Sequence, residues 1–143
     1  MNLNPLQWTT LRAAMDRIVP PDDFPGAWDA GVGDFLAGMF QKELCPVVPT
    51  YSNGLDALEA EAQARYERAF HEITSEEQDA ILTAVSDGRT HAAWNTAPIA
   101  FFRMLIHHVN EGYYSDPGNG GNRDGIAWKM TGFSERYVIH EAL

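Results

Sequence analysis

The sequence predicts an all-α protein, a single-domain helical bundle of about five helices with a long C-terminal loop rich in glycine and aromatic residues. Apolar residues recur at spacings of three and four along several segments, which is the period of a helix with one buried face. Helix-start signals precede these segments, and no run of residues alternates convincingly as a β-strand would. At 143 residues, a single domain is expected over 1–143, with helices at about 5–112 and the loop and tail at 113–143.

The first helix is expected to begin at Pro5, because Asn4 is a good N-cap and proline suits the first helical position. Prolines 20 and 21 should end it. A turn-rich connector, Pro20 to Gly26, then leads to the second helix. The apolar face of the first helix comprises Trp8, Leu11, Met15 and Ile18.

The second helix is expected over about Ala30 to Lys42, with Asp29 as its cap. Residues Glu43 to Asn53 contain two prolines and no helical period, so we expect a loop there. The third helix has the clearest periodicity. Its expected buried face comprises Tyr51, Leu55, Leu58, Ala62, Arg65, Tyr66 and Ala69, with Glu59, Glu61, Gln63, Glu67 and Arg68 on the other sides.

The fourth helix is expected to follow a capping box in which Thr74 caps the backbone and Glu77 reaches back. It should stop at Gly88, and its inward residues are predicted to be Ala80, Ile81, Ala84 and Val85. The fifth helix should start at Thr96, with Pro98 just inside it, and end at Glu111-Gly112. It carries two apolar stripes, which predicts a central place in the bundle: Ile99, Phe102, Ile106 and Val109 in one, and Phe101, Leu105 and His108 in the other. Beyond it, residues 137–139 could form a short strand, a final turn or a docked tail.

The charge balance excludes some classes of partner. The net charge is −10 at pH 7, whereas a nucleic-acid or anionic-membrane surface requires a basic face. No run approaches the roughly 18 apolar residues of a membrane span, so no direct membrane insertion is expected. Cys45 is the only cysteine and cannot form an internal disulfide.

The stretch from Glu111 to Phe133 is the most unusual part of the chain, and we call it the signature stretch. It contains half of the twelve glycines together with large aromatic residues. A flexible linker would be poor in aromatics, so this composition indicates a loop that holds one shape or acquires it against a partner. Two interpretations remain open: the loop covers the protein's own core, or it forms a partner surface, since Tyr, Trp and Arg are enriched at interface hot spots.

A metal or catalytic role has little support. The signature stretch has no phosphate-loop or calcium-loop pattern. The alternative is a stand-alone helical enzyme or metal-binding protein that uses His107, His108 and Glu111. His108 and Glu111 are three apart on the expected helix and would share a face, but the duplicated Glu and His pattern of four-helix metal sites is absent.

Several segments together resemble the gluconate 2-dehydrogenase subunit 3 family, also called its small or gamma subunit. These are DRIVPPDDFPGAWDAGVGDFL (16–36), GLDALEAEAQARY (54–66), FHEITSEEQDAIL (70–82) and the signature stretch EGYYSDPGNGGNRDGIAWKMTGF (111–133). The resemblance covers nearly the whole chain, and its most specific part is the combination of Tyr-x-x-Pro, Gly-Gly-Asn-Arg and Trp-Lys-Met in the signature stretch.

The resemblance implies a non-catalytic accessory subunit of a dehydrogenase that oxidises a sugar or sugar acid. The implied partner in the heterodimer is a large subunit of the glucose–methanol–choline type that holds FAD, and a cytochrome c subunit often accepts the electrons. The small subunit would support folding, flavin loading or export of the large one in a chaperone-like manner. No cofactor, metal or catalytic residue is expected in this chain. Family members are commonly exported to the periplasm by a twin-arginine signal; this sequence starts directly at its first helix, so a periplasmic location is expected if a signal was removed and a cytoplasmic one otherwise.

We expect the signature stretch to dock into the large subunit. Aromatic anchors would enter pockets, Arg123 would offer a planar fork to carboxylates or carbonyls, and the glycines at 118, 120, 121 and 125 would let the backbone lie close to the partner. The predicted partner-binding residues are Tyr113, Tyr114, Asp116, Asn119, Asn122, Arg123, Trp128, Lys129 and Phe133.

Overall fold

The computed structural model describes residues 2–114 and residue 121, and these residues confirm the all-α prediction. Within this part of the chain there are five α-helices, two short 3₁₀ helices and no strand. The helices are α1 (Pro5–Ile18), α2 (Val32–Phe40), η1 (Cys45–Val47), α3 (Val48–Tyr66), η2 (Phe70–Glu72), α4 (Ser75–Ser86) and α5 (Pro98–Tyr113).

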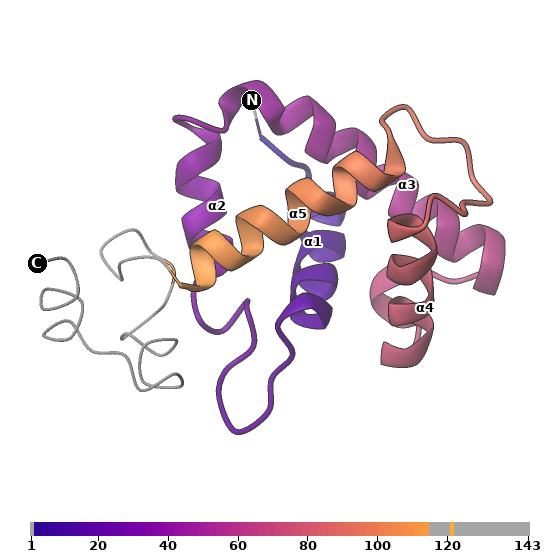
Figure 1. The fold of residues 1–143 in the computed structure, drawn as a ribbon, viewed down its shortest axis with the longest axis horizontal. Helices are drawn as coiled ribbons and strands as arrows, with labels where there is room; N and C mark the ends of the chain where they lie inside the picture. Colours follow the sequence, from indigo (N-terminus) through magenta and orange to yellow (C-terminus); the bar gives the residue numbers. More distant parts are fainter. Residues whose placement is uncertain (1, 115–120, 122–143) are drawn as a thin grey trace, which may run out of the picture.

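Helix α5 holds the bundle together. Figure 1 shows it crossing α1, from the neighbourhood of α3 and α4 at one end to that of α2 at the other. It packs against each of these four helices, while α1 also contacts α3 and α4. The central position that its two apolar stripes predicted is therefore confirmed.

Two of the predicted helix starts are correct in detail. The Asn4 side chain accepts a hydrogen bond from the Gln7 N–H, and the Gln7 side chain accepts one from the Asn4 N–H in return. The same reciprocal capping box joins Thr74 and Glu77 at the start of α4. Such caps satisfy backbone donors that the first turn of a helix leaves without partners.

The loop predicted over residues 43–53 extends too far, because residues 48–53 belong to α3. Cys45–Val47 form η1, and α3 begins at Val48. Pro49 lies in the first turn of α3, where its missing N–H costs no helical hydrogen bond, so the proline starts this helix instead of excluding it. Burial of Val48 and Tyr51 in the core stabilises this first turn.

The starts of two other helices shift by one or two residues. Helix α2 starts at Val32 instead of Ala30, and its N-cap is Gly31 in a left-handed conformation with φ 92°, not Asp29. A glycine adopts this φ without the steric cost that a side chain would add. The cap of α5 is Ala97, not Thr96, and α5 continues to Tyr113.

Two buried faces also differ from the prediction. Ala80 is exposed on α4, where Leu82 takes part in the core instead. On α3, Glu61 was assigned to a side other than the buried one, yet it is fully buried.

The core itself is apolar and aromatic. The ring of Tyr51 contacts those of Phe40 and Phe101, with ring centroids 5.0 and 6.0 Å apart. Within the described residues, no helix is long and apolar enough to cross a membrane.

Candidate functional site

The C-terminal end of α5, where the signature stretch begins, is fixed to the body of the protein. Gly112 faces α2 at close range. A Cβ added to it would lie 2.8 Å from Cδ2 of Phe35 and 3.1 Å from Cγ1 of Val32. Only a residue without a side chain allows α5 and α2 to approach this closely.

Tyr113 adds a second attachment, to the connector between α1 and α2. Its side chain is fully buried, and its hydroxyl donates a hydrogen bond of 2.9 Å to the Pro25 carbonyl. Burial raises the pKa of Tyr113, and the neighbouring Tyr114 and Asp22 raise it further, so the phenol stays protonated and remains a donor. The last turn of α5 is thereby joined to a segment 88 residues earlier in the chain.

Tyr114 lies at the surface beside Tyr113. It is 47% exposed, and its ring meets that of Tyr113 edge-on, with centroids 5.2 Å apart. Two of the predicted partner-binding residues are therefore described, one in the protein's own core and one at its surface. The other seven, like the element expected at residues 137–139, lie outside the described residues and stay predictions: Asp116, Asn119, Asn122, Arg123, Trp128, Lys129 and Phe133.

The histidine patch is divided between core and surface. His108 is buried, and its Nδ1 lies 2.8 Å from the hydroxyl of Tyr51. His107 is exposed, and its Nε2 lies 3.5 Å from Oε2 of Glu111. Glu111 thus pairs with His107, four residues before it, instead of forming a ligand pair with His108. Across residues 2–114, no group of three or more His, Cys, Asp and Glu residues could hold a metal ion.

The protonation state of His108 follows from its surroundings. Burial lowers its pKa, the neighbouring His107 lowers it further, and Glu111 only partly opposes them. Burial and the charge of Glu111 raise the pKa of Tyr51 well above its ordinary value. Both groups are therefore uncharged near neutral pH, and they share one hydrogen bond whose direction depends on the imidazole tautomer.

A polar centre built on Glu61 was not among the predicted sites. Its Oε1 accepts hydrogen bonds from the backbone N–H groups of His91 (2.8 Å) and Ala92 (2.7 Å) and from Nε1 of Trp94 (3.2 Å). Its Oε2 accepts one of 3.0 Å from Arg65. A single carboxylate therefore fixes the connector between α4 and α5 onto α3. The only local sequence signal for this centre is the spacing of four residues between Glu61 and Arg65. The same spacing is equally typical of an ion pair on the exposed face of a helix.

Glu61 stays ionised despite its burial. Burial alone would raise its pKa, but the donors from Ala92, Arg65, Trp94 and His91 together outweigh burial, so the pKa is lowered. Arg65 also donates to the Arg89 carbonyl at 2.9 Å, which extends the network to the end of α4.

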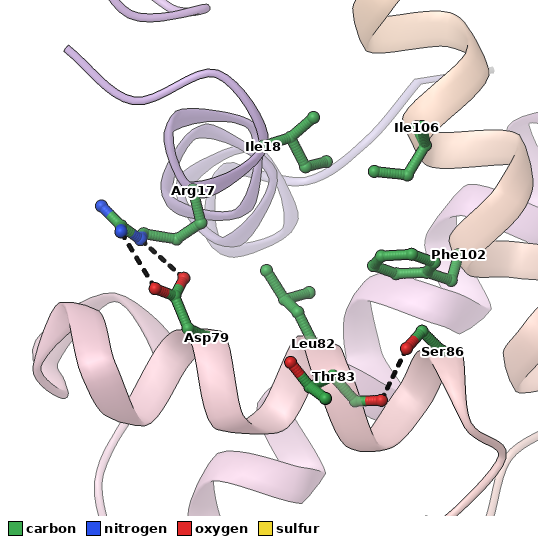
Figure 2. Close-up of a pocket in the computed structure, with 8 residues that line it drawn as sticks. All are labelled: Arg17, Ile18, Asp79, Leu82, Thr83, Ser86, Phe102 and Ile106. Atoms are coloured by element: carbon green, nitrogen blue, oxygen red, sulfur yellow. Dashed lines mark hydrogen bonds and ion pairs between the residues drawn. The ribbon is translucent and has the colours of Figure 1, made fainter. Parts of the chain in front are cut away.

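A groove of about 440 Å³ opens where α1, α4 and α5 meet. Figure 2 shows apolar side chains from all three helices along it: Ile18, Leu82, Phe102 and Ile106. At its edge, the guanidinium of Arg17 donates two hydrogen bonds, of 2.8 and 3.0 Å, to the carboxylate of Asp79. This pair links α1 to α4 at the edge of the groove.

A comparison with known families decides where this chain belongs. The family model for gluconate 2-dehydrogenase subunit 3 matches residues 5–134, which include every helix of the structure and the whole signature stretch. The chain belongs to the gluconate 2-dehydrogenase subunit 3 family. Members of this family are accessory subunits of a dehydrogenase complex, as its name implies. No curated protein and no solved structure matches the chain.

Proposed function

We propose that this chain is a non-catalytic small subunit that binds the large FAD-containing subunit of a sugar or sugar-acid dehydrogenase. The large subunit, of the glucose–methanol–choline type, would hold the flavin and carry out the oxidation, while this chain would hold no cofactor. The observation that carries the proposal is the family match, which extends through the signature stretch as well as the helical body.

The geometry at the end of α5 supports a binding role for the signature stretch. Gly112 and Tyr113 fix the residues from which it starts, and Tyr114 presents an aromatic ring at the surface. Because the residues where the stretch begins are already held in place, less conformational entropy is lost when the stretch binds a partner. Aromatic side chains and arginine, which the stretch supplies at Trp128, Phe133 and Arg123, are the residues most often found as interface anchors.

The benefit to the large subunit would follow from mass action. A protein that binds only the folded form of its partner stabilises that form. Support of folding, of flavin retention and of export of a folded complex would all result from such binding. We propose that export, where it occurs, takes the pair to the periplasm, where a cytochrome c subunit can accept the electrons.

The role of the signature stretch is tested by truncating its largest anchor. The chain and the large subunit are co-expressed, and the large subunit recovered on a tag of this chain is quantified. Trp128→Ala should reduce recovery strongly, because loss of a hot spot costs roughly 2 kcal/mol or more of association. The matched control is Leu6→Ala, which truncates an apolar residue 48% exposed on α1. Equal recovery with both variants would refute the anchor role.

A further inference from the structure

Of the histidines that the structure describes, only His108 is buried. It lies between α3 and α5, where its ring stacks on that of Tyr51 and shares a hydrogen bond of 2.8 Å with the Tyr51 hydroxyl. An imidazole has an ordinary pKa of about 6.5, so it gains a positive charge in mild acid, and an isolated charge is costly inside a core. A fall in pH therefore acts on the packing between α3 and α5 at this place.

The neighbours of His108 on α5 do not balance such a charge. Glu111 favours the charged imidazole, but it is exposed, and its Oε2 lies 3.5 Å from Nε2 of His107. His107 opposes a second positive charge, because its ring centroid is 5.6 Å from that of His108. Together with burial, these neighbours leave the pKa of His108 below its ordinary value.

The other helices that pack on α5 offer no counter-charge either. Helix α3 faces His108 with the uncharged phenol of Tyr51. The one ionisable residue of α2, Asp34, is exposed. Where α1 and α4 line a groove with α5, their charged residues Arg17 and Asp79 pair with each other. Within residues 2–114, the charges that act on His108 therefore come from its own helix.

The residues just after His108 attach the start of the signature stretch to the body of the protein. Gly112 follows His108 by one helical turn on the same face and packs against Phe35 of α2. Tyr113 follows directly, with its hydroxyl bonded to the Pro25 carbonyl. His108 and Tyr113 are about 7.5 Å apart along the helix, at the end of α5 that lies beside α2 in Figure 1. Movement of His108 towards water therefore disturbs both attachments.

We propose that the C-terminal end of α5 is a pH-sensitive switch that controls the signature stretch. Protonation of His108 favours an opened form, in which residues 108–113 are released from α2 and α3 and water solvates the imidazolium. The signature stretch then begins at residues that are not held in place, and it binds the large subunit less tightly. The inference rests on the proposed function, because it concerns the regulation of the same binding segment.

The opening is measured on the isolated chain, so this part of the test does not require the large subunit. Amide hydrogen exchange of Gly112, Tyr113 and Tyr114 is recorded at pH 7.5 and pH 5.5 and divided by the intrinsic exchange rate at each pH. In the opened form His108 regains its ordinary pKa of about 6.5, whereas burial keeps the pKa lower in the packed form. The corrected exchange rate should therefore rise on the order of tenfold at pH 5.5.

Two matched substitutions assign the effect to one side chain. His108→Asn keeps a polar group beside the Tyr51 hydroxyl but cannot be protonated, so the rise in exchange should disappear. His107→Asn removes the exposed histidine next to it and should keep most of the rise. Far-UV circular dichroism at pH 7.5 checks that each variant is folded. An NMR titration of the His108 imidazole in the unmodified chain relates the opening to its protonation without any substitution.

Control of binding is measured on the complex. The chain and the large subunit are co-expressed, immobilised on a tag of this chain and washed at pH 7.5 or pH 5.5, and the large subunit that remains is quantified. Wild type and His107→Asn should retain several-fold less large subunit at pH 5.5 than at pH 7.5. His108→Asn should retain similar amounts at both pH values.

A corrected exchange rate that is the same at both pH values, or that rises equally in wild type and His108→Asn, would overturn the switch. Equal retention of the large subunit by wild type at both pH values would overturn its control of binding and leave the proposed function intact. If the wild-type chain binds no large subunit even at pH 7.5, the proposed function fails, and the control of binding fails with it.

Discussion

The hydroxyl of Tyr51 on α3 and Nδ1 of His108 on α5 share a hydrogen bond of 2.8 Å inside the core. The two rings are also stacked, with centroids 5.8 Å apart and planes at 22°. Because burial disfavours the charged imidazole, the contact between α3 and α5 depends on the protonation state of this histidine.

We therefore expect the free energy of unfolding to fall as the pH drops below about 6.5, the ordinary pKa of histidine. The pKa of His108 is lowered in the folded protein, so in this range the unfolded chain binds a proton that the folded one does not. Denaturant unfolding at pH 7 and at pH 5.5 measures the effect. In the double variant Tyr51→Phe/His108→Leu, the free energy of unfolding should depend less on pH. An unchanged pH dependence would contradict the assignment of this effect to His108.

Glu61 should contribute more to stability than an exposed glutamate. Glu61→Ala leaves the N–H groups of His91 and Ala92 without their acceptor, and we expect a loss of roughly 3 kcal/mol in the free energy of unfolding. Glu43→Ala, at an exposed position in the turn before η1, should change it by about 0.5 kcal/mol or less. Chemical denaturation of both variants gives the comparison, and similar losses would show that the buried network is not what stabilises the connector.

The same carboxylate should make the protein sensitive to strong acid. Because hydrogen bonds lower the pKa of Glu61 in the folded state, its contribution is complete above the ordinary glutamate pKa of about 4.3 and is lost as the pH falls through the lowered value. This window lies below that of His108. Acid unfolding of Glu61→Gln should show a smaller pH dependence there than wild type, and equal slopes would contradict the prediction.

The crossing of α3 and α5 depends on Gly54. A Cβ at this position would lie 2.2 Å from the ring of Phe101, so Gly54→Ala must displace either this ring or one of the two helices. We expect a destabilisation of roughly 1–3 kcal/mol. Gly38→Ala on α2 is the control, since a Cβ there meets nothing within 4 Å and alanine favours a helix. A melting temperature that falls equally in both variants would contradict the proposed close approach.

Removal of one hydroxyl tests the attachment of the signature stretch. Tyr113→Phe deletes the hydrogen bond to Pro25 and should lower the free energy of unfolding by about 1 kcal/mol. Tyr114→Phe, at the half-exposed neighbour, should have little effect on the isolated chain. Thermal unfolding of both variants provides the measurement; if Tyr113→Phe matched wild type, the hydroxyl would have no anchoring role.

Some features set by neighbouring residues were predictable from the sequence, whereas hydrogen bonds between distant residues were not. The capping boxes at Asn4 and Thr74 need only residues three positions away, so their chemistry is visible in the chain. Pro49 was misread because proline signals both a loop and a first helical turn. The burial of Glu61 depends on backbone groups 30 and 31 residues later, and the Tyr113 hydrogen bond on a carbonyl 88 residues earlier. Neither partner is visible in a local pattern.

The measurement that tests the central claim most directly is purification of this chain on its own tag, with and without the large subunit co-expressed. The visible spectrum and the sugar-dependent reduction of a dye are then recorded. A binding subunit predicts a yellow complex that contains both chains and reduces the dye, and no flavin or activity when the chain is expressed alone. A chain that stays colourless and alone in the presence of the large subunit would contradict the account.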